Sequence, residues 1–138
     1  MARGVVWSFL LGALLAFLGG CNAAPESGQA AEKAQAALEL YRRRPAADTY
    51  ENFIHANRAA ASAHDNPHDS VGIEYQLRAL EVMAAEAERA RDLALADDVV
   101  ERAEEIERRD LVGAYDETLA DASARLAAAK GRAAALIR

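Results

Sequence analysis

The chain has a single cysteine, Cys21, among its 138 residues. One cysteine cannot form an intramolecular disulfide, so an apolar core has to stabilise the fold. Aromatic residues make up only 6% of the chain, and valine and isoleucine are sparse. No stretch shows the sustained polar/apolar alternation of a β-strand. The abundant alanine, glutamate, arginine and leucine are strong helix formers, and they predict an all-α protein.

Basic residues are also in short supply, with 16 lysines and arginines against 22 acidic residues and a net charge of −6. This balance argues against nucleic-acid binding and against electrostatic adhesion to anionic lipid, because both require basic surfaces. The sequence has neither a glycine-rich phosphate loop nor a Gly-x-Ser-x-Gly nucleophile motif. We therefore expect no enzymatic activity and no bound cofactor.

The N-terminal segment has the layout of an export signal. Arg3 supplies positive charge, an apolar run covers residues 5–18, and two glycines precede Cys21. A membrane-spanning helix needs about 20 apolar residues, so this run is too short to be one. The sequence Leu18-Gly19-Gly20-Cys21 resembles the lipobox of bacterial lipoproteins.

In that family the cysteine thiol receives a diacylglyceryl group, signal peptidase II cuts before the cysteine, and the new amine is acylated. The resemblance implies that residues 1–20 are a cleaved signal peptide and that a lipidated Cys21 begins the mature chain. It also implies attachment to a membrane through acyl chains such as palmitate, with cell-envelope proteins as the expected partners. An aspartate after the cysteine often retains such proteins at the inner membrane. Asn22 therefore favours the outer membrane, facing the periplasm.

Residues 22–29 include two helix breakers, Pro25 and Gly28, and show no apolar periodicity. This composition predicts a short linker, so residues 21–29 comprise this linker and the cysteine whose lipidation the resemblance implies. The helical domain then occupies residues 30–138. Apolar periodicity predicts helices over residues 30–44, 48–63 and 71–95, and a further helix from residue 98.

Capping and breaking signals place the helix boundaries. Pro45 ends the first helix, and Asp48 with Glu51 has the form of a capping box for the second. A similar box begins at Asp98. Near Asp110 the apolar register changes, which indicates either one helix with a stutter or, as we prefer, a break or kink before a fifth helix. We expect an antiparallel bundle of four to five helices.

The cleanest periodic signal lies in the C-terminal segment. Apolar residues there follow alternating steps of three and four, at Val112, Tyr115, Leu119, Ala122, Leu126, Ala129, Ala133 and Leu136. This heptad-like seam fits packing inside the bundle. Alternatively, two chains would self-associate as a coiled coil through Val112, Leu119, Leu126 and Leu136, although the many alanines weaken that option.

One polar cluster has the composition of a metal site, formed by His64, Asp65, His68 and Asp69. On a helix, His64 and His68 would share a face at a spacing that zinc sites use. Asn66-Pro67 between them predicts a turn instead, so these histidines are weak metal candidates. The sequence therefore indicates a membrane-anchored, non-catalytic interaction or scaffold domain. The alternatives are a self-assembling coiled-coil lipoprotein and a helical domain that binds a metal or small ligand.

Overall fold

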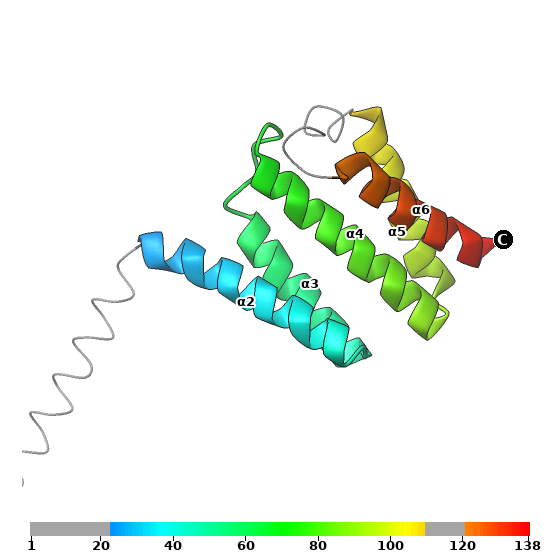
Figure 1. Ribbon diagram of the computed structural model, residues 1–138, viewed down its shortest axis with the longest axis horizontal. Helices are drawn as coiled ribbons and strands as arrows, with labels where there is room; N and C mark the ends of the chain where they lie inside the picture. Colours follow the sequence, from blue (N-terminus) through cyan, green and yellow to red (C-terminus); the bar gives the residue numbers. More distant parts are fainter. Residues whose placement is uncertain (1–22, 110–120) are drawn as a thin grey trace, which may run out of the picture.

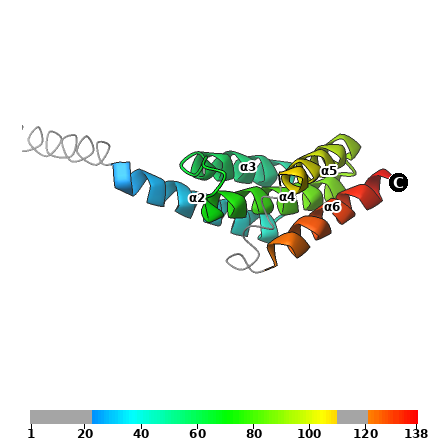
Figure 2. The ribbon, with the colours of Figure 1, turned by 90° about the horizontal axis from the view of Figure 1, so that it is seen from above.

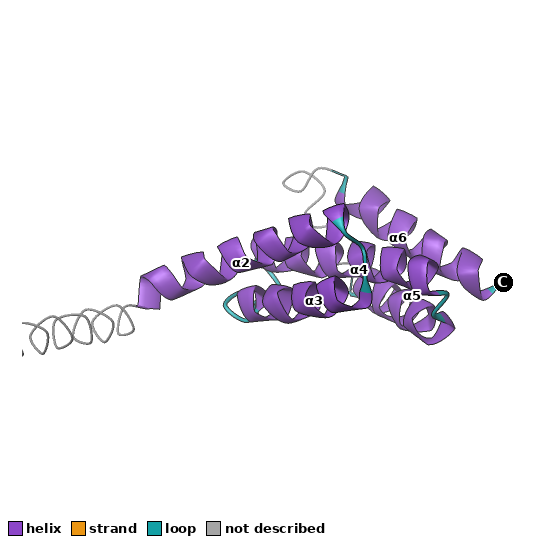
Figure 3. Cartoon of the chain, turned by 90° about the horizontal axis from the view of Figure 1, so that it is seen from below, coloured by secondary structure: helices purple, strands orange, loops and turns teal. Residues whose placement is uncertain are grey.

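The computed structural model describes residues 23–109 and 121–138, and these residues form helices and no strand. The helices are α2 (Ala23–Arg43), α3 (Ala47–Ala61), α4 (Ser70–Ala90), α5 (Leu93–Arg108) and α6 (Ala122–Ile137). Figure 1 shows α4 between the α2/α3 pair and the α5/α6 pair. Two layers are visible in Figures 2 and 3, with α2, α4 and α6 in one and α3 and α5 in the other. The predicted all-α bundle is confirmed.

Helix α4 lies at the centre of the core because it is buried on two sides. One side packs against α5 and α6 and contains an apolar stripe of Ile73, Leu77, Leu80, Ala84 and Ala87. The other side packs against α2 and α3, where Tyr75 shares an apolar cluster with Ala34 and Ala60, and Val82 shares another with Leu38 and Phe53. Each fully buried leucine- or phenylalanine-sized side chain contributes about 1.5–3 kcal/mol, so α4 supplies a large share of the burial energy.

The segment predicted as a linker is helical, and that prediction was wrong. Helix α2 begins at Ala23 and continues through Pro25 and Gly28 to Arg43. Proline is tolerated in the first turn of a helix, because the N–H groups there have no partner within the helix. A glycine in a helix interior costs about 1 kcal/mol, which a long helix can absorb. The helix was predicted to end at residue 44, just before Pro45, and it ends one residue earlier, at Arg43.

The N-terminus of α3 is held by Thr49 and not by the predicted Asp48–Glu51 box. Thr49 Oγ1 accepts a hydrogen bond from the Ala46 N–H at 3.1 Å and donates to the Arg44 carbonyl at 2.8 Å. Asp48 instead forms an ion pair with Arg44 at 3.0 Å. Thr49 is buried, so its hydroxyl joins the end of α2 to the start of α3.

The break between α4 and α5 lies earlier in the chain than predicted. Helix α4 ends at Ala90, Arg91 adopts a left-handed conformation with φ of 54°, and Asp92 caps α5. The Asp92 side chain accepts the Leu95 N–H at 3.0 Å. Asp98 lies inside α5 and pairs with Arg102, so the expected capping box at Asp98 was wrong. An aspartate four residues before an arginine on a helix forms an ion pair as readily as a cap.

The preferred break after α5 is confirmed, since α5 ends at Arg108 and α6 is a separate helix that begins at Ala122. Asp110, and Val112, Tyr115 and Leu119 of the predicted seam, lie outside the described residues. The rest of the seam packs against α4 and α5 within the same chain, with Leu136 half-buried and Ala122, Leu126, Ala129 and Ala133 buried.

We predict that Leu126→Ala lowers the free energy of unfolding by about 2–5 kcal/mol, because Leu126 is 2% exposed and its loss leaves a cavity. Ile137→Ala is the matched control on the same helix. Ile137 is 40% exposed, so this change should cost less than about 1 kcal/mol. Urea denaturation at two protein concentrations measures both effects. A Leu126→Ala loss that varies with protein concentration would contradict intramolecular packing of the seam.

Candidate interaction groove

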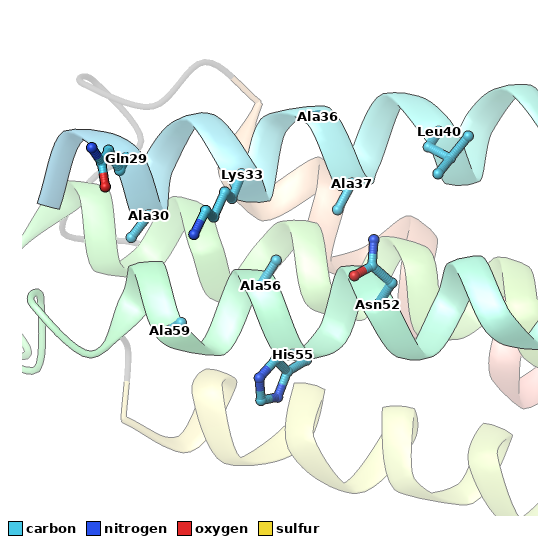
Figure 4. A pocket seen from close by; sticks show the side chains of 10 residues that line it. All are labelled: Gln29, Ala30, Lys33, Ala36, Ala37, Leu40, Asn52, His55, Ala56 and Ala59. Carbon is cyan, nitrogen blue, oxygen red and sulfur yellow. The ribbon is translucent and has the colours of Figure 1, made fainter. Parts of the chain in front are cut away.

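An open groove runs between α2 and α3, on the flank of this pair that α4 does not cover (Figure 4). Its volume is about 560 Å³. Of its α2 residues, Ala37 is buried and belongs to the core cluster of Leu38 and Tyr41, whereas Lys33 and Ala36 are exposed. The apolar lining consists of Ala30, Ala36, Ala37, Leu40, Ala56 and Ala59. Small side chains allow another helix to approach closely.

Four polar side chains complete the lining, Gln29 and Lys33 from α2 and Asn52 and His55 from α3. Figure 4 shows Lys33 extending from α2 towards the space between the helices, and His55 on the far side of α3. Within the described part of the chain, none of the four forms a hydrogen bond or an ion pair, and the groove lining contains no carboxylate. The groove is therefore an apolar hollow with basic and amide groups available for a ligand.

A second hollow, between α4 and α5, has a different character. Its floor contains Leu80, Met83 and Ile106, but its rim is charged. Four of the five charged side chains there are joined in pairs, Asp98 with Arg102 at 3.0 Å and Glu105 with Arg108 at 2.7 Å, and the fifth is Glu101. Because most of its charges already have partners in the chain, this hollow is a weaker candidate for binding than the α2/α3 groove.

The predicted turn that contains His64 and His68 is confirmed, since it joins α3 to α4. The structure does not bring its two histidines together as metal ligands. His64 Nδ1 lies 2.6 Å from Asp69 Oδ2, and His68 is exposed. No group of three or more His, Cys, Asp or Glu side chains in residues 23–109 and 121–138 is arranged to hold a metal ion.

Asp69 links the turn to the start of α4. Its Oδ1 accepts the Val71 N–H at 2.9 Å, and the hydrogen bond from His64 holds the pKa of this carboxyl below its usual range. The His64 ring also lies against Tyr75, with 5.9 Å between ring centroids. These contacts give the turn a structural role in orienting α4 against α3.

One carboxylate, Glu86, is buried between α4 and α2, and sequence reasoning did not find it. Its Oε2 accepts hydrogen bonds from the Tyr41 hydroxyl at 2.9 Å and from Arg89 Nε at 2.8 Å. The hydrogen bonds from Arg89 outweigh burial and lower the pKa of Glu86. Burial and the adjacent carboxylate raise the pKa of Tyr41. Tyr41 is therefore a neutral donor to an ionised Glu86 at neutral pH.

Cys21, the predicted lipidation site, lies outside the described residues. Of the helices that the structure describes, none has the length and apolar character needed to cross a membrane.

The chain matches no family model, no curated protein and no solved structure.

The groove between α2 and α3 was absent from the sequence predictions. Its only sequence signal is the excess of alanine on both helices, and alanine is as common in a core as on an exposed face.

We predict that Gly72→Ala and Gly131→Ala have opposite effects on stability. A Cβ atom at Gly72 would lie 2.5 Å from the His64 carbonyl oxygen, so the turn would have to move at a cost of about 1–3 kcal/mol. Nothing lies within 4 Å of a Cβ atom at Gly131, where alanine should stabilise α6 by about 0.5–1 kcal/mol. Thermal and urea unfolding measure both changes. Equal effects at the two positions would refute the close packing of the turn.

We predict that Glu86→Gln is destabilising by about 1–3 kcal/mol at pH 7, because it weakens charge-assisted hydrogen bonds at a buried position. The native pKa of Glu86 is lowered, so ionisation stabilises the fold above the ordinary glutamate pKa of about 4.3. That contribution is lost as the pH falls through the lowered native pKa.

The difference between wild type and Glu86→Gln should therefore shrink below about pH 4 in urea unfolding series. Glu51→Gln is the control, since Glu51 is exposed on α3, and its effect should stay within about 0.5 kcal/mol. A Glu86→Gln difference that is constant from pH 7 to about pH 3 would show that the charge of Glu86 is not what stabilises the fold.

Proposed function

We propose that this protein is a bacterial lipoprotein whose helical domain acts as a non-catalytic interaction module at a membrane. The observation that carries the proposal is the open α2/α3 groove, because its small apolar lining has no occupant from the described part of the chain. The lipobox resemblance at Leu18-Gly19-Gly20-Cys21 supports the anchor. The groove's four polar groups form no hydrogen bonds with one another, which favours binding over catalysis.

The anchor and the groove share one helix. Helix α2 begins two residues after Cys21, and it supplies one wall of the groove. Two or more acyl chains on Cys21 would hold the protein stably at a bilayer. With Asn22 after the cysteine, we place the protein at the outer membrane, where the groove faces periplasmic partners.

The test places a photo-crosslinking amino acid in the full-length protein in bacterial cells. At Ala36, inside the groove, we expect a discrete crosslink to one partner. At Ala127, an exposed alanine on α6, we expect none of comparable intensity. The same cells are labelled with a palmitate analogue, which should mark the wild type and not Cys21→Ser.

Each half of the proposal can fail separately. Labelling that persists in Cys21→Ser, or wild-type protein without label, would refute lipidation at Cys21. Equal crosslinking at Ala36 and Ala127, or none at Ala36, would refute the groove as the interaction site. A crosslink at Ala36 that disappears in Cys21→Ser would indicate that the partner is reached only from the membrane.

A further inference from the structure

Helix α6 shows how this protein fills a groove between two helices. Its apolar residues enter the space between α4 and α5, where Leu126 is buried. Basic residues beside this stripe then pair with carboxylates on the two walls. These pairs join Arg125 to Glu74 and Glu81, Lys130 to Glu104 and Glu107, and Arg132 to Glu88. An apolar stripe with charged flanks is thus the form of helix that fits such a groove.

The open α2/α3 groove has the same apolar character but the opposite charge on its walls. Its ionisable lining residues are Lys33 and His55, and the lining has no carboxylate although the chain has 22 acidic residues. Lys33 is exposed, and no carboxylate of the described chain pairs with it. A bound helix would need acidic flanks where α6 has basic ones.

We propose that the α2/α3 groove binds an amphipathic helix of a partner protein, with a stripe of alanine and leucine flanked by carboxylates. The carboxylates would pair with Lys33 on the α2 wall, and His55 lies at the outer margin of the groove, on the far side of α3. This inference rests on the proposed function of the chain as an interaction domain. Exposed ion pairs contribute little affinity but select the partner and its orientation.

Helices α5 and α6 of a second copy do not supply such a helix. The exposed face of α6 is small, with Ala124, Ala128 and Gly131, but α6 contains no acidic residue. Helix α5 is rich in carboxylates, but its apolar residues Val99 and Ile106 are already buried against α4 and α6. Charge complementarity therefore favours a different protein over self-association.

The experiment uses full-length protein in detergent and two synthetic peptides of about 20 residues, long enough to form a helix. Both peptides have the same alanine and leucine stripe, flanked by glutamate in one and by lysine in the other. Fluorescence anisotropy measures their binding to wild type and to the double variant Lys33→Glu, His55→Glu. Both positions are exposed, so the double variant should fold, and circular dichroism checks this. Ala36→Trp blocks the groove, and Ala127→Trp is its control on α6.

We expect the glutamate peptide to bind wild type at least about fivefold more tightly than the lysine peptide. The double variant should reverse this preference, and added salt should reduce it. Ala36→Trp should weaken binding of both peptides at least about tenfold, whereas Ala127→Trp should leave it unchanged.

Equal binding of the two peptides would overturn the acidic partner while leaving the groove as a docking site. Binding of neither peptide, or binding unaffected by Ala36→Trp, would overturn the inference. Protein that self-associates in a manner abolished by Ala36→Trp would assign the groove to a second copy instead. The peptide experiment tests only the chemistry of the partner helix. Crosslinking at Ala36 in cells tests the proposed function independently, so the failure of one can be told from the failure of the other.

Discussion

Burial of α4 on both sides is the constraint on which the rest of the structure depends. A helix with one apolar face needs one partner surface, but α4 packs against α2 and α3 on one side and against α5 and α6 on the other. The layered arrangement follows, since the helices before and after α4 have to cover different faces of it. It also explains Glu86, which lies on a covered face and remains ionised because Tyr41 and Arg89 donate to it.

The sequence predicted the parts of the fold that depend on periodicity. Four of the five described residues of the C-terminal seam are buried, as its periodicity predicted, because a stripe of apolar residues packs into the core. Boundaries were less predictable where two local interactions compete. Aspartate at either Asp92 or Asp98 can cap a helix, and in the structure Asp92 caps α5 while Asp98 pairs with Arg102. Helix α2 passes through Pro25 for a similar reason, since the first turn of a helix tolerates proline.

The candidate site was harder to predict than the fold. His64 was a candidate metal ligand because imidazole binds metal ions, but in the structure it pairs with Asp69 and holds the turn. The groove could not be inferred because its lining alanines look like core residues, and only the positions of α2, α3 and α4 in space show which alanines remain uncovered. Glu86 was missed because carboxylates are rarely buried and its partner Tyr41 is 45 residues away.

Because α2 is continuous, it sets the direction in which the groove faces relative to the start of the helix. Each residue of an α-helix turns the chain by about 100° about the helix axis, so the spacing between Ala23 and Lys33 fixes a rotational phase. One inserted residue near Gly28 would turn the groove by about a quarter-turn around the axis of α2, relative to the first turn of that helix, and shift it by about 1.5 Å. Three inserted residues would bring it back to within about 60° of the original direction, and four to within about 40°. The number of residues between the start of α2 and the groove therefore matters more than their identity, because it sets the direction of the groove relative to the first turn of the helix.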